Sequence, residues 1–529
     1  MKERRRNMVD TKKQVLPIFT EAEWTPELLE AVTEEVKKIA EEELELSYYP
    51  IQIRIITSEQ MLDAYASVGM PVGYAHWSFG KQFLKNDRAY RSGQMGLAYE
   101  IVINTDPCLV FCMEDNTMTM QSLVIAHAGF GHNAFFKNNY LFQRWTNPDG
   151  IIDYLVFAKD FIQECEDKYG IDAVSETLDA CHALQNYGVD RYKRSVKLSF
   201  EQEKARMEER AENIQQNLNV IWRTLPKPTE GEVKKEDAER FPKDPEENLL
   251  YFVEKNAPHL PDWKREIIRI VRKIAQYFYP QIQTKVMNEG FACFTHYYIM
   301  TRLHEKGLIT EGSYQEFLHS HTNVVFQPEF DSPFFRGINP YALGFGMFMD
   351  IKRICENPTD EDRKWFPDMA GKPWLPVVKY AMENFKDESF ILQYLSPRLI
   401  RKFGLFAIQD DDREDELEVT AIHDGDGYQR VREALAGQHD LGVNAPNIQV
   451  ESVDVRGTRE CKLVHHAVDR RPLDEKETGD TLLYFYQLWE YPVSLYSVAQ
   501  NGVDIEHWKC EDGKTVRHAE NTDVDFSLD

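Results

Sequence analysis

One apolar segment constrains the fold of this chain more than any other. Residues Thr117–Asn138 are mostly apolar, and a helix of that character has to be buried in a larger body. Two histidines, His127 and His132, and two glycines, Gly129 and Gly131, stand inside it. A glycine costs a helix interior about 1 kcal/mol relative to alanine, so the pair of glycines indicates close packing or a functional reason.

The spacing of the two histidines leaves two interpretations open. His127 and His132 are five residues apart, which on a regular α-helix turns their side chains about 140° away from each other. A π-bulge at the glycines would bring positions i and i+5 nearly into line, and such bulges are common at functional sites. The segment therefore predicts either two metal ligands on a π-bulge, or one core histidine and one capping histidine near a helix break.

A second helix, Val286–His296, supplies a carboxylate. Glu289 stands there among apolar and aromatic residues, and a buried carboxylate has to be paired, hydrogen-bonded or bound to a cation. His296 follows on the same face, about 10 Å further along the axis, so Glu289 and His296 can line one pocket without binding one ion. A salt bridge from Glu289 to an arginine is the alternative.

Other residues are further candidates. Glu100 lies in a predicted strand and points either inward or outward, and Glu164 and His182 lie in predicted helices. A further set of polar and aromatic residues either lines a functional site or has an ordinary structural role. These residues are His319, His321, Asp190, Arg191, Arg194 and the loop His76–Lys81.

The pattern as a whole predicts a mainly α-helical body with a small β element, followed by an α+β domain. Strands are expected at 51–56 and 99–104. Helices are expected over 21–45, 117–138, 149–168, 172–187, 199–222, 247–307 and 341–355.

A change of pattern after Gly404 sets the domain boundaries. Short strands follow it, interrupted by helices near 426–437 and 476–489, which is an α+β pattern. We therefore divide the chain into a flexible N-terminus, 1–20, a helical body, 21–404, and a C-terminal α+β domain, 405–529. Within the body, the proline-rich and charged segment 224–246 predicts a linker-like excursion.

Charge and hydropathy exclude several classes of protein. The formal net charge is −26, and the segment 405–529 alone holds 28 acidic and 12 basic residues. Nucleic-acid binding needs a basic face, so we expect no nucleic-acid partner. No apolar run approaches the ~18 residues of a membrane span, and no apolar segment follows the basic N-terminus as in a signal peptide. The eight dispersed cysteines are typical of free thiols in a reducing compartment, and we expect a cytoplasmic protein.

Long motifs in the chain resemble the stage V sporulation protein R (SpoVR) family from about residue 22 onward. The motifs are Ser58–Met61, Ala75–Lys81, Gly96–Asn104, His127–Asn133, Asn186–Tyr192, Asn288–Gly290, His319–Pro328 and Asn339–Gly344. The resemblance implies a cytoplasmic bacterial protein linked to spore cortex formation, or to other physiology in species that do not sporulate. It also implies, as partners, a PrkA-type serine kinase and a von Willebrand A-type domain protein.

A further resemblance concerns chemistry. The run Asn288–Ala292 is similar to the helix of gluzincin metallopeptidases that supplies the third zinc ligand. Carried over to this chain, the resemblance implies that His127, His132 and Glu289 bind Zn²⁺ or another divalent ion in an open three-ligand site. The chain departs from the HExxH pattern, because Ala128 stands where that motif has its general-base glutamate. A base therefore has to come from Glu100, Glu164 or His296, or the site is not hydrolytic.

The leading hypothesis is a zincin-like, metal-dependent hydrolase or amidase, with a peptidoglycan-related substrate inferred from the family resemblance. One alternative is a non-enzymatic regulatory or scaffold protein that acts with the kinase and the von Willebrand A-type protein. Another is a dinuclear carboxylate/histidine oxidase that uses Glu164 and His182.

Overall fold

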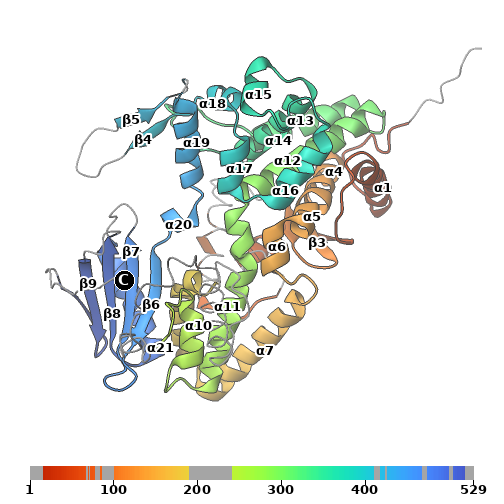
Figure 1. The fold of residues 1–529 in the computed structure, drawn as a ribbon. Helices are drawn as coiled ribbons and strands as arrows, with labels where there is room; N and C mark the ends of the chain where they lie inside the picture. The colour runs from red at the N-terminus through yellow and green to blue at the C-terminus, as the bar shows by residue number, and fades with distance from the viewer. Residues whose placement is uncertain are drawn as a thin grey trace, which may run out of the picture. The chain divides into compact units, whose positions relative to one another are not determined.

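The computed structural model divides into two compact units, each made of two stretches of chain. It describes residues 16–66, 100–189, 241–409, 418–422, 426–467, 473–499 and 504–518, with residue 424 and a few residues between 70 and 88. Unit 1 comprises residues 1–167 and 277–444, and unit 2 comprises residues 168–276 and 445–529 (Figure 1). Residues 405–444, which the sequence division places in the C-terminal domain, thus belong to unit 1.

Unit 1 is mainly helical, as predicted. Its helices, of which η1 is a π-helix, are α1 (Pro26–Glu42), α2 (Ser58–Ala66), α4 (Met118–Val124), η1 (Ile125–His132), α5 (Asn133–Asn138), α6 (Tyr140–Trp145), α7 (Ile151–Tyr169), α12 (Lys285–Glu305), α13 (Glu311–Val324), α14 (Pro340–Glu356), α15 (Asp360–Trp365), α16 (Trp374–Asn384), α17 (Asp387–Tyr394), α18 (Pro397–Lys402), α19 (Gly427–Gly437) and α20 (Leu441–Asn444). Local sequence fixes several of their first residues. For example, Thr25 caps α1 by accepting a hydrogen bond from the backbone N–H of Leu28, and Pro26 occupies the first helical position.

The small β element of unit 1 is a three-stranded sheet in the order β1–β3–β2. Strand β1 (Ile51–Ile56) runs parallel to β3 (Cys108–Met113), and β2 (Glu100–Ile103) runs antiparallel to β3. The prediction of β1 and β2 is confirmed, whereas β3 was not predicted. This arrangement puts Glu100 at the first position of β2, opposite Cys112. A separate pair, β4 (Ala407–Gln409) and β5 (Glu418–Ala421), follows α18.

The core of unit 1 is a continuous apolar cluster to which α1, α4, η1, α12, α14, α16 and α17 all contribute. Helix α12 packs against both η1 and α14. At the crossing with α14 the two backbones meet at glycines, since a Cβ added to Gly344 would lie 2.0 Å from the carbonyl oxygen of Val286 and one added to Gly290 would lie 2.4 Å from Cα of Gly344. Only glycine permits this approach, which brings the start of α14 beside Glu289.

Unit 2 combines a five-stranded sheet with helices. The sheet has the order β10–β9–β8–β7–β6, in which only β7 and β8 are parallel neighbours. Its strands are β6 (Asn447–Val453), β7 (Cys461–Ala467), β8 (Val493–Ala499), β9 (Asp504–Glu511) and β10 (Lys514–His518). Its helices are α8 (Ile171–Ala183), η2 (Gln185–Tyr187), α10 (Leu249–Asn256), α21 (Glu475–Trp489) and α11 (Asp262–Gln283), the last of which enters unit 1 at Tyr277.

Some predictions fall wholly or partly outside the described residues. These are the N-terminal residues 1–15, the charged helix 199–222, residues 224–240 of the linker-like segment, Asp190, Arg191, Arg194 and part of the loop His76–Lys81. The described end of the linker-like segment is hydrogen-bonded to β6, where Glu246 pairs with Val450.

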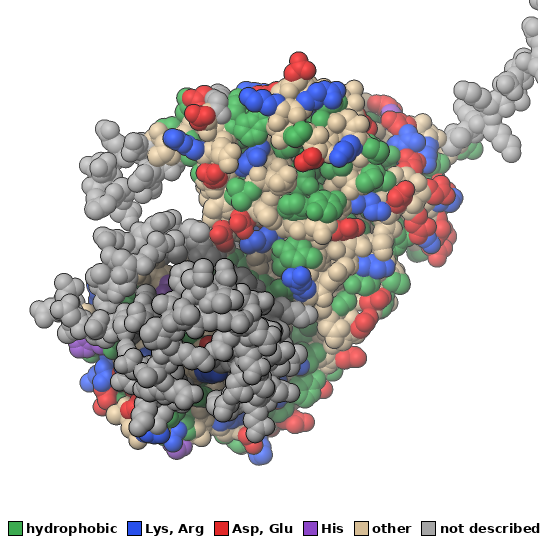
Figure 2. Space-filling view, viewed as in Figure 1, with side chains coloured by type: hydrophobic (Ala, Val, Ile, Leu, Met, Phe, Trp, Pro, Cys, Tyr) green, Lys and Arg blue, Asp and Glu red, His purple; other side chains and the backbone are tan. Residues whose placement is uncertain are grey.

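The cysteines, the helices and the surface of the described residues can be compared with the sequence analysis. All eight cysteines are buried free thiols. Among the described residues, no helix combines the length and apolarity that a bilayer crossing requires. Figure 2 shows acidic and basic side chains interspersed over the described surface of unit 1 in that view, without one dominant sign.

Candidate metal centre

The two histidines of the apolar segment lie together because the helix is a π-helix there. The π-helical stretch η1 spans Ile125–His132, so it contains both histidines, His127 as its third residue and His132 as its last. The ring centroids of His127 and His132 are 4.6 Å apart, and the two residues are only 6% and 5% exposed. Of the two interpretations left open by the sequence, the structure thus has the π-helical geometry, which brings positions i and i+5 to the same side of the helix.

Glycine 131 lets this helix lie close to α12. A Cβ added to Gly131 would lie 2.7 Å from Cα of Ala292, a contact with helix backbone that a rotamer change does not relieve. A Cβ added to Gly129 would instead meet Cδ1 of Ile51 at 3.3 Å, which is the flexible end of a side chain. The close approach at Gly131 therefore sets the distance between the histidines of η1 and Glu289 of α12.

Four side chains from three elements converge at this point. Nε2 of His127 is 3.2 Å from Oε1 of Glu100 and 3.9 Å from Oε2 of Glu289, and Nε2 of His132 is 3.3 Å from Oε2 of Glu289. Two ligands of a tetrahedral zinc ion, each about 2.0–2.2 Å from it, are separated by about 3.4 Å. The spacing and chemistry of the donor atoms thus fit a divalent cation, and Glu100, His127 and His132 form a group that could hold one.

Glu100 brings an unsatisfied oxygen to the group. Its Oε2 is buried and has no hydrogen-bond partner among the described residues. Burial raises the pKa of Glu100 to about 8, an effect that the nearby His132 opposes and Glu289 reinforces. A buried carboxylate oxygen without a partner needs a proton, a cation or a polar ligand beside it.

Polar partners fix the orientation of His132 and Glu289. Nδ1 of His132 is 2.8 Å from Oδ1 of Asn288, and because an amide oxygen only accepts, His132 donates this bond and directs Nε2 at Glu289. Burial alone would lower the pKa of His132, but the carboxylates of Glu289 and Glu100 outweigh it and raise the pKa. The phenol of Tyr341 lies beside Glu289, and burial together with that carboxylate raises the pKa of Tyr341, which keeps the phenol protonated.

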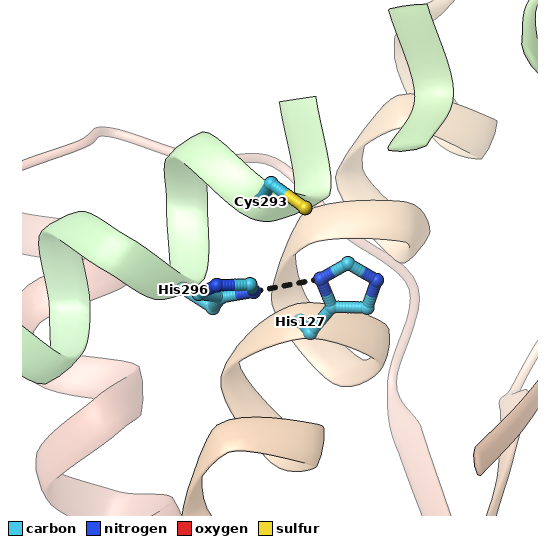
Figure 3. A group of neighbouring side chains, drawn as sticks. All are labelled: His127, Cys293 and His296. Carbon is cyan, nitrogen blue, oxygen red and sulfur yellow. Dashed lines mark hydrogen bonds between the residues drawn. The ribbon is translucent and has the colours of Figure 1, made fainter. Parts of the chain in front are cut away.

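A second group of potential ligands adjoins the first, formed by His127, Cys293 and His296 (Figure 3). Nδ1 of His127 and Nδ1 of His296 are 2.8 Å apart, which is a hydrogen-bond distance and shorter than the roughly 3.4 Å that separates two tetrahedral zinc ligands. Burial lowers the pKa of both histidines and raises that of the Cys293 thiol. The geometry of this group is that of a neutral hydrogen-bonded pair beside a protonated thiol.

The structure brings together Glu100, His127, His132 and Glu289, and it places the other sequence candidates differently. His296 is near the group, but both of its ring nitrogens are hydrogen-bonded, to His127 and to His321. Among the described residues, no hydrogen bond or ion pair joins Glu164 to the group, and this residue is exposed on α7 in unit 1. His182 lies in unit 2, His319 is exposed on α13, and His321 is buried.

Sequence reasoning missed two contributors to the centre. Tyr341 was noticed only as part of the motif Asn339–Gly344, and Asn288 only as the neighbour of Glu289. Each residue reaches the centre because of tertiary packing. Tyr341 does so through the glycine crossing of α12 and α14, and Asn288 through the contact of η1 with α12. The sequence did contain one signal for Tyr341, because Gly344, three residues later, is a glycine inside a helix and indicates a close helix crossing there.

These features define a buried histidine and carboxylate centre in a helical body, and comparison with known proteins gives the family. Residues 23–444 match the family model described as SpoVR like protein, and residues 446–500 match the SpoVR-like C-terminal domain. The chain therefore belongs to the SpoVR family. The two matches meet where the second stretch of unit 1 ends, at residue 444.

A relative and the solved structures complete the comparison. The chain is 55% identical over 480 residues to the "Uncharacterized protein YcgB" of Escherichia coli K12, which covers 91% of this chain and 94% of that protein. No solved structure matches the chain.

Proposed function

We propose that this SpoVR-family protein is a metal-dependent hydrolase that acts on an amide bond. The observation that carries the proposal is the convergence of two imidazole nitrogens and two carboxylates at separations of 3.2–3.9 Å in the interior of unit 1. In this proposal His127, His132 and Glu289 hold Zn²⁺ or a similar divalent ion. The fold of unit 1 resembles that of zincins in one respect, because a strand, the histidine helix and the glutamate helix occur in that order along the chain.

Glu100 takes the part of the general base. When bound, the ion polarises an amide carbonyl and lowers the pKa of its water. Ala128 has no group that accepts a proton, whereas Oε2 of Glu100 is unpartnered and Oε1 lies 3.2 Å from a ligand nitrogen. Burial raises the pKa of Glu100 to about 8, and a divalent cation held beside it would lower that pKa, so that the carboxylate would take a proton from water and return it to the leaving amine. Tyr341, held protonated beside Glu289, would be a hydrogen-bond donor at the same centre.

Metal content tests the centre. We expect purified wild-type protein to contain about one equivalent of a divalent transition metal, measured by elemental analysis, and expect His127→Ala, His132→Ala and Glu289→Gln each to lose it. His319→Ala is the matched control, because His319 is an exposed histidine of α13 outside the centre. Wild-type protein without metal, or variants that keep the full amount, would overturn the proposal.

The Glu100→Gln variant separates a base from a ligand. Glutamine keeps the size of the side chain but does not take up a proton, so the variant should retain metal and lose roughly 10²–10⁴-fold in hydrolytic rate. Peptide amides and muropeptides are the first substrates to assay, because the family resemblance links this protein to spore cortex and hence to peptidoglycan. If Glu100→Gln loses its metal instead, Glu100 is a fourth ligand and not the base.

The cellular setting is proposed from the family resemblance alone. We place the protein in the cytoplasm, in partnership with a PrkA-type serine kinase and a von Willebrand A-type domain protein. Pull-down of either partner by the full-length chain tests the partnership, and binding that survives the metal-site substitutions would be expected for a docking surface separate from the centre.

A further inference from the structure

Three buried histidines form a continuous hydrogen-bonded chain that ends at the candidate metal ligand His127. Nδ1 of His127 lies 2.8 Å from Nδ1 of His296, and Nε2 of His296 lies 2.7 Å from Nδ1 of His321. The three residues come from η1, α12 and α13 and are 6%, 2% and 4% exposed. Figure 3 shows the first of these bonds, with the His296 ring directed at the His127 ring from the neighbouring helix.

A chain of neutral imidazoles has a direction. Each neutral ring carries one N–H and one lone pair, so if His127 donates through Nδ1, His296 has to donate through Nε2 to His321. Nε2 of His127 then presents a lone pair toward Glu100 and Glu289, as a metal ligand requires. In the opposite direction every proton moves to the other nitrogen of its ring, and Nε2 of His127 carries a proton toward Oε1 of Glu100, 3.2 Å away.

Nε2 of His127 faces the carboxylates of Glu100 and Glu289, and a cation held between them would require the direction that leaves Nε2 unprotonated. At the other end, the rings of Phe345, Tyr297 and Phe317 lie 4.7, 5.0 and 5.8 Å from that of His321, centroid to centroid, and hold it in place.

We propose that His296 and His321 are positioning residues that fix the tautomer and orientation of His127 and so set the affinity of the metal centre. This inference rests on the proposed function. Ligand histidines generally donate their second N–H to a carboxylate or carbonyl. In this protein two further imidazoles extend that support, and they make His127 sensitive to residues that do not touch the ion.

Cobalt binding tests the inference with a conservative rescue. Co²⁺ affinity is measured by chelator competition, and the visible Co²⁺ spectrum reports the ligand geometry. We expect His321→Leu and His296→Leu to bind Co²⁺ about 10–100-fold more weakly than wild type, with an altered spectrum. His321→Asn should recover most of the affinity, because the asparagine Oδ1 stands near the position of the histidine Nδ1 and accepts the same bond from His296. Thermal melts without metal verify that each variant is folded.

His319→Leu is the matched control, since it removes an exposed histidine from the same helix. If wild type binds Co²⁺ and His321→Leu and His296→Leu bind it equally well with the same spectrum, the inference fails while the proposed function stands. It also fails if His321→Asn is no better than His321→Leu. If wild type itself binds no Co²⁺, the proposed function and the inference fail together.

Discussion

The close approach of η1 to α12 at Gly131 gives the sharpest prediction from packing. In Gly131→Ala the new Cβ would lie 2.7 Å from Cα and 3.0 Å from Cβ of Ala292, whereas carbon atoms prefer about 3.5–4.0 Å. The overlap of about 1 Å is with the backbone of α12, so one helix has to move. Overpacking of this kind costs about 1–3 kcal/mol, against a gain of about 1 kcal/mol from replacing a helical glycine with alanine.

Gly129→Ala is the matched control within the same helix. Its Cβ would meet only the terminal methyl of Ile51, at 3.3 Å, and that methyl can rotate away. The gain from alanine is common to both variants, so the difference in their free energies of unfolding isolates the clash and should be about 1–3 kcal/mol.

Two assays check the prediction. Denaturant melts compare the stabilities, and metal titration compares the affinities, which should fall at least tenfold in Gly131→Ala because its histidines move relative to Glu289. Gly129→Ala should bind metal as wild type does. Equal stability and equal metal affinity in the two variants would refute the reasoning that Gly131 sets the spacing of the centre.

Three further substitutions test other contacts. Tyr341→Phe removes the protonated phenol hydroxyl beside Glu289 and should lower metal affinity about tenfold with little change in the melting temperature, and an unchanged affinity would argue against a role for this hydroxyl. Asp387→Ala leaves two backbone N–H groups at the start of α12 without their acceptor, 2.8 Å away in each case, and should destabilise the protein by roughly 2 kcal/mol or more in denaturant melts. Asp362→Asn tests pH dependence, because burial raises the pKa of Asp362 but hydrogen bonds from Arg353 and the cap of α15 outweigh it and lower the pKa. The stabilisation is therefore fully present above the unfolded pKa of about 3.9 and is lost progressively as the pH falls from there through the lower folded-state pKa, so the variant should be roughly 3 kcal/mol less stable at pH 7 and the difference should shrink steadily below pH 4.

The elements that sequence predicted well are those with strong local patterns. The alternation in Ile51–Ile56 gave β1 with its observed bounds, and the apolar run Thr117–Asn138 gave the buried helix of α4, η1 and α5. The π-helix was one of two alternatives that the sequence offered, because two histidines five residues apart face the same side only if the helix is distorted.

The parts that sequence missed depend on tertiary contacts. The chemistry of residues Cys108–Met113 does not show that they pair with both β1 and β2, because a strand's pairing depends on its neighbours in space, and β1 lies about fifty residues earlier in the chain. For the same reason the division of the chain was not foreseen, since unit 2 assembles residues 168–276 with residues from 445 onward. Glu164 was a candidate base by residue type alone, and its exposure on α7 depends on which face of that helix packs inward.

The measurement that tests the central claim most directly is anomalous X-ray scattering from a crystal of the protein purified with its native metal. The account predicts an anomalous peak within about 2.0–2.2 Å of Nε2 of His127, Nε2 of His132 and a carboxylate oxygen of Glu289. Its absorption edge would identify the metal. A structure in which these three side chains contact no anomalous scatterer, although the crystal was grown with a divalent transition metal in excess, would contradict it.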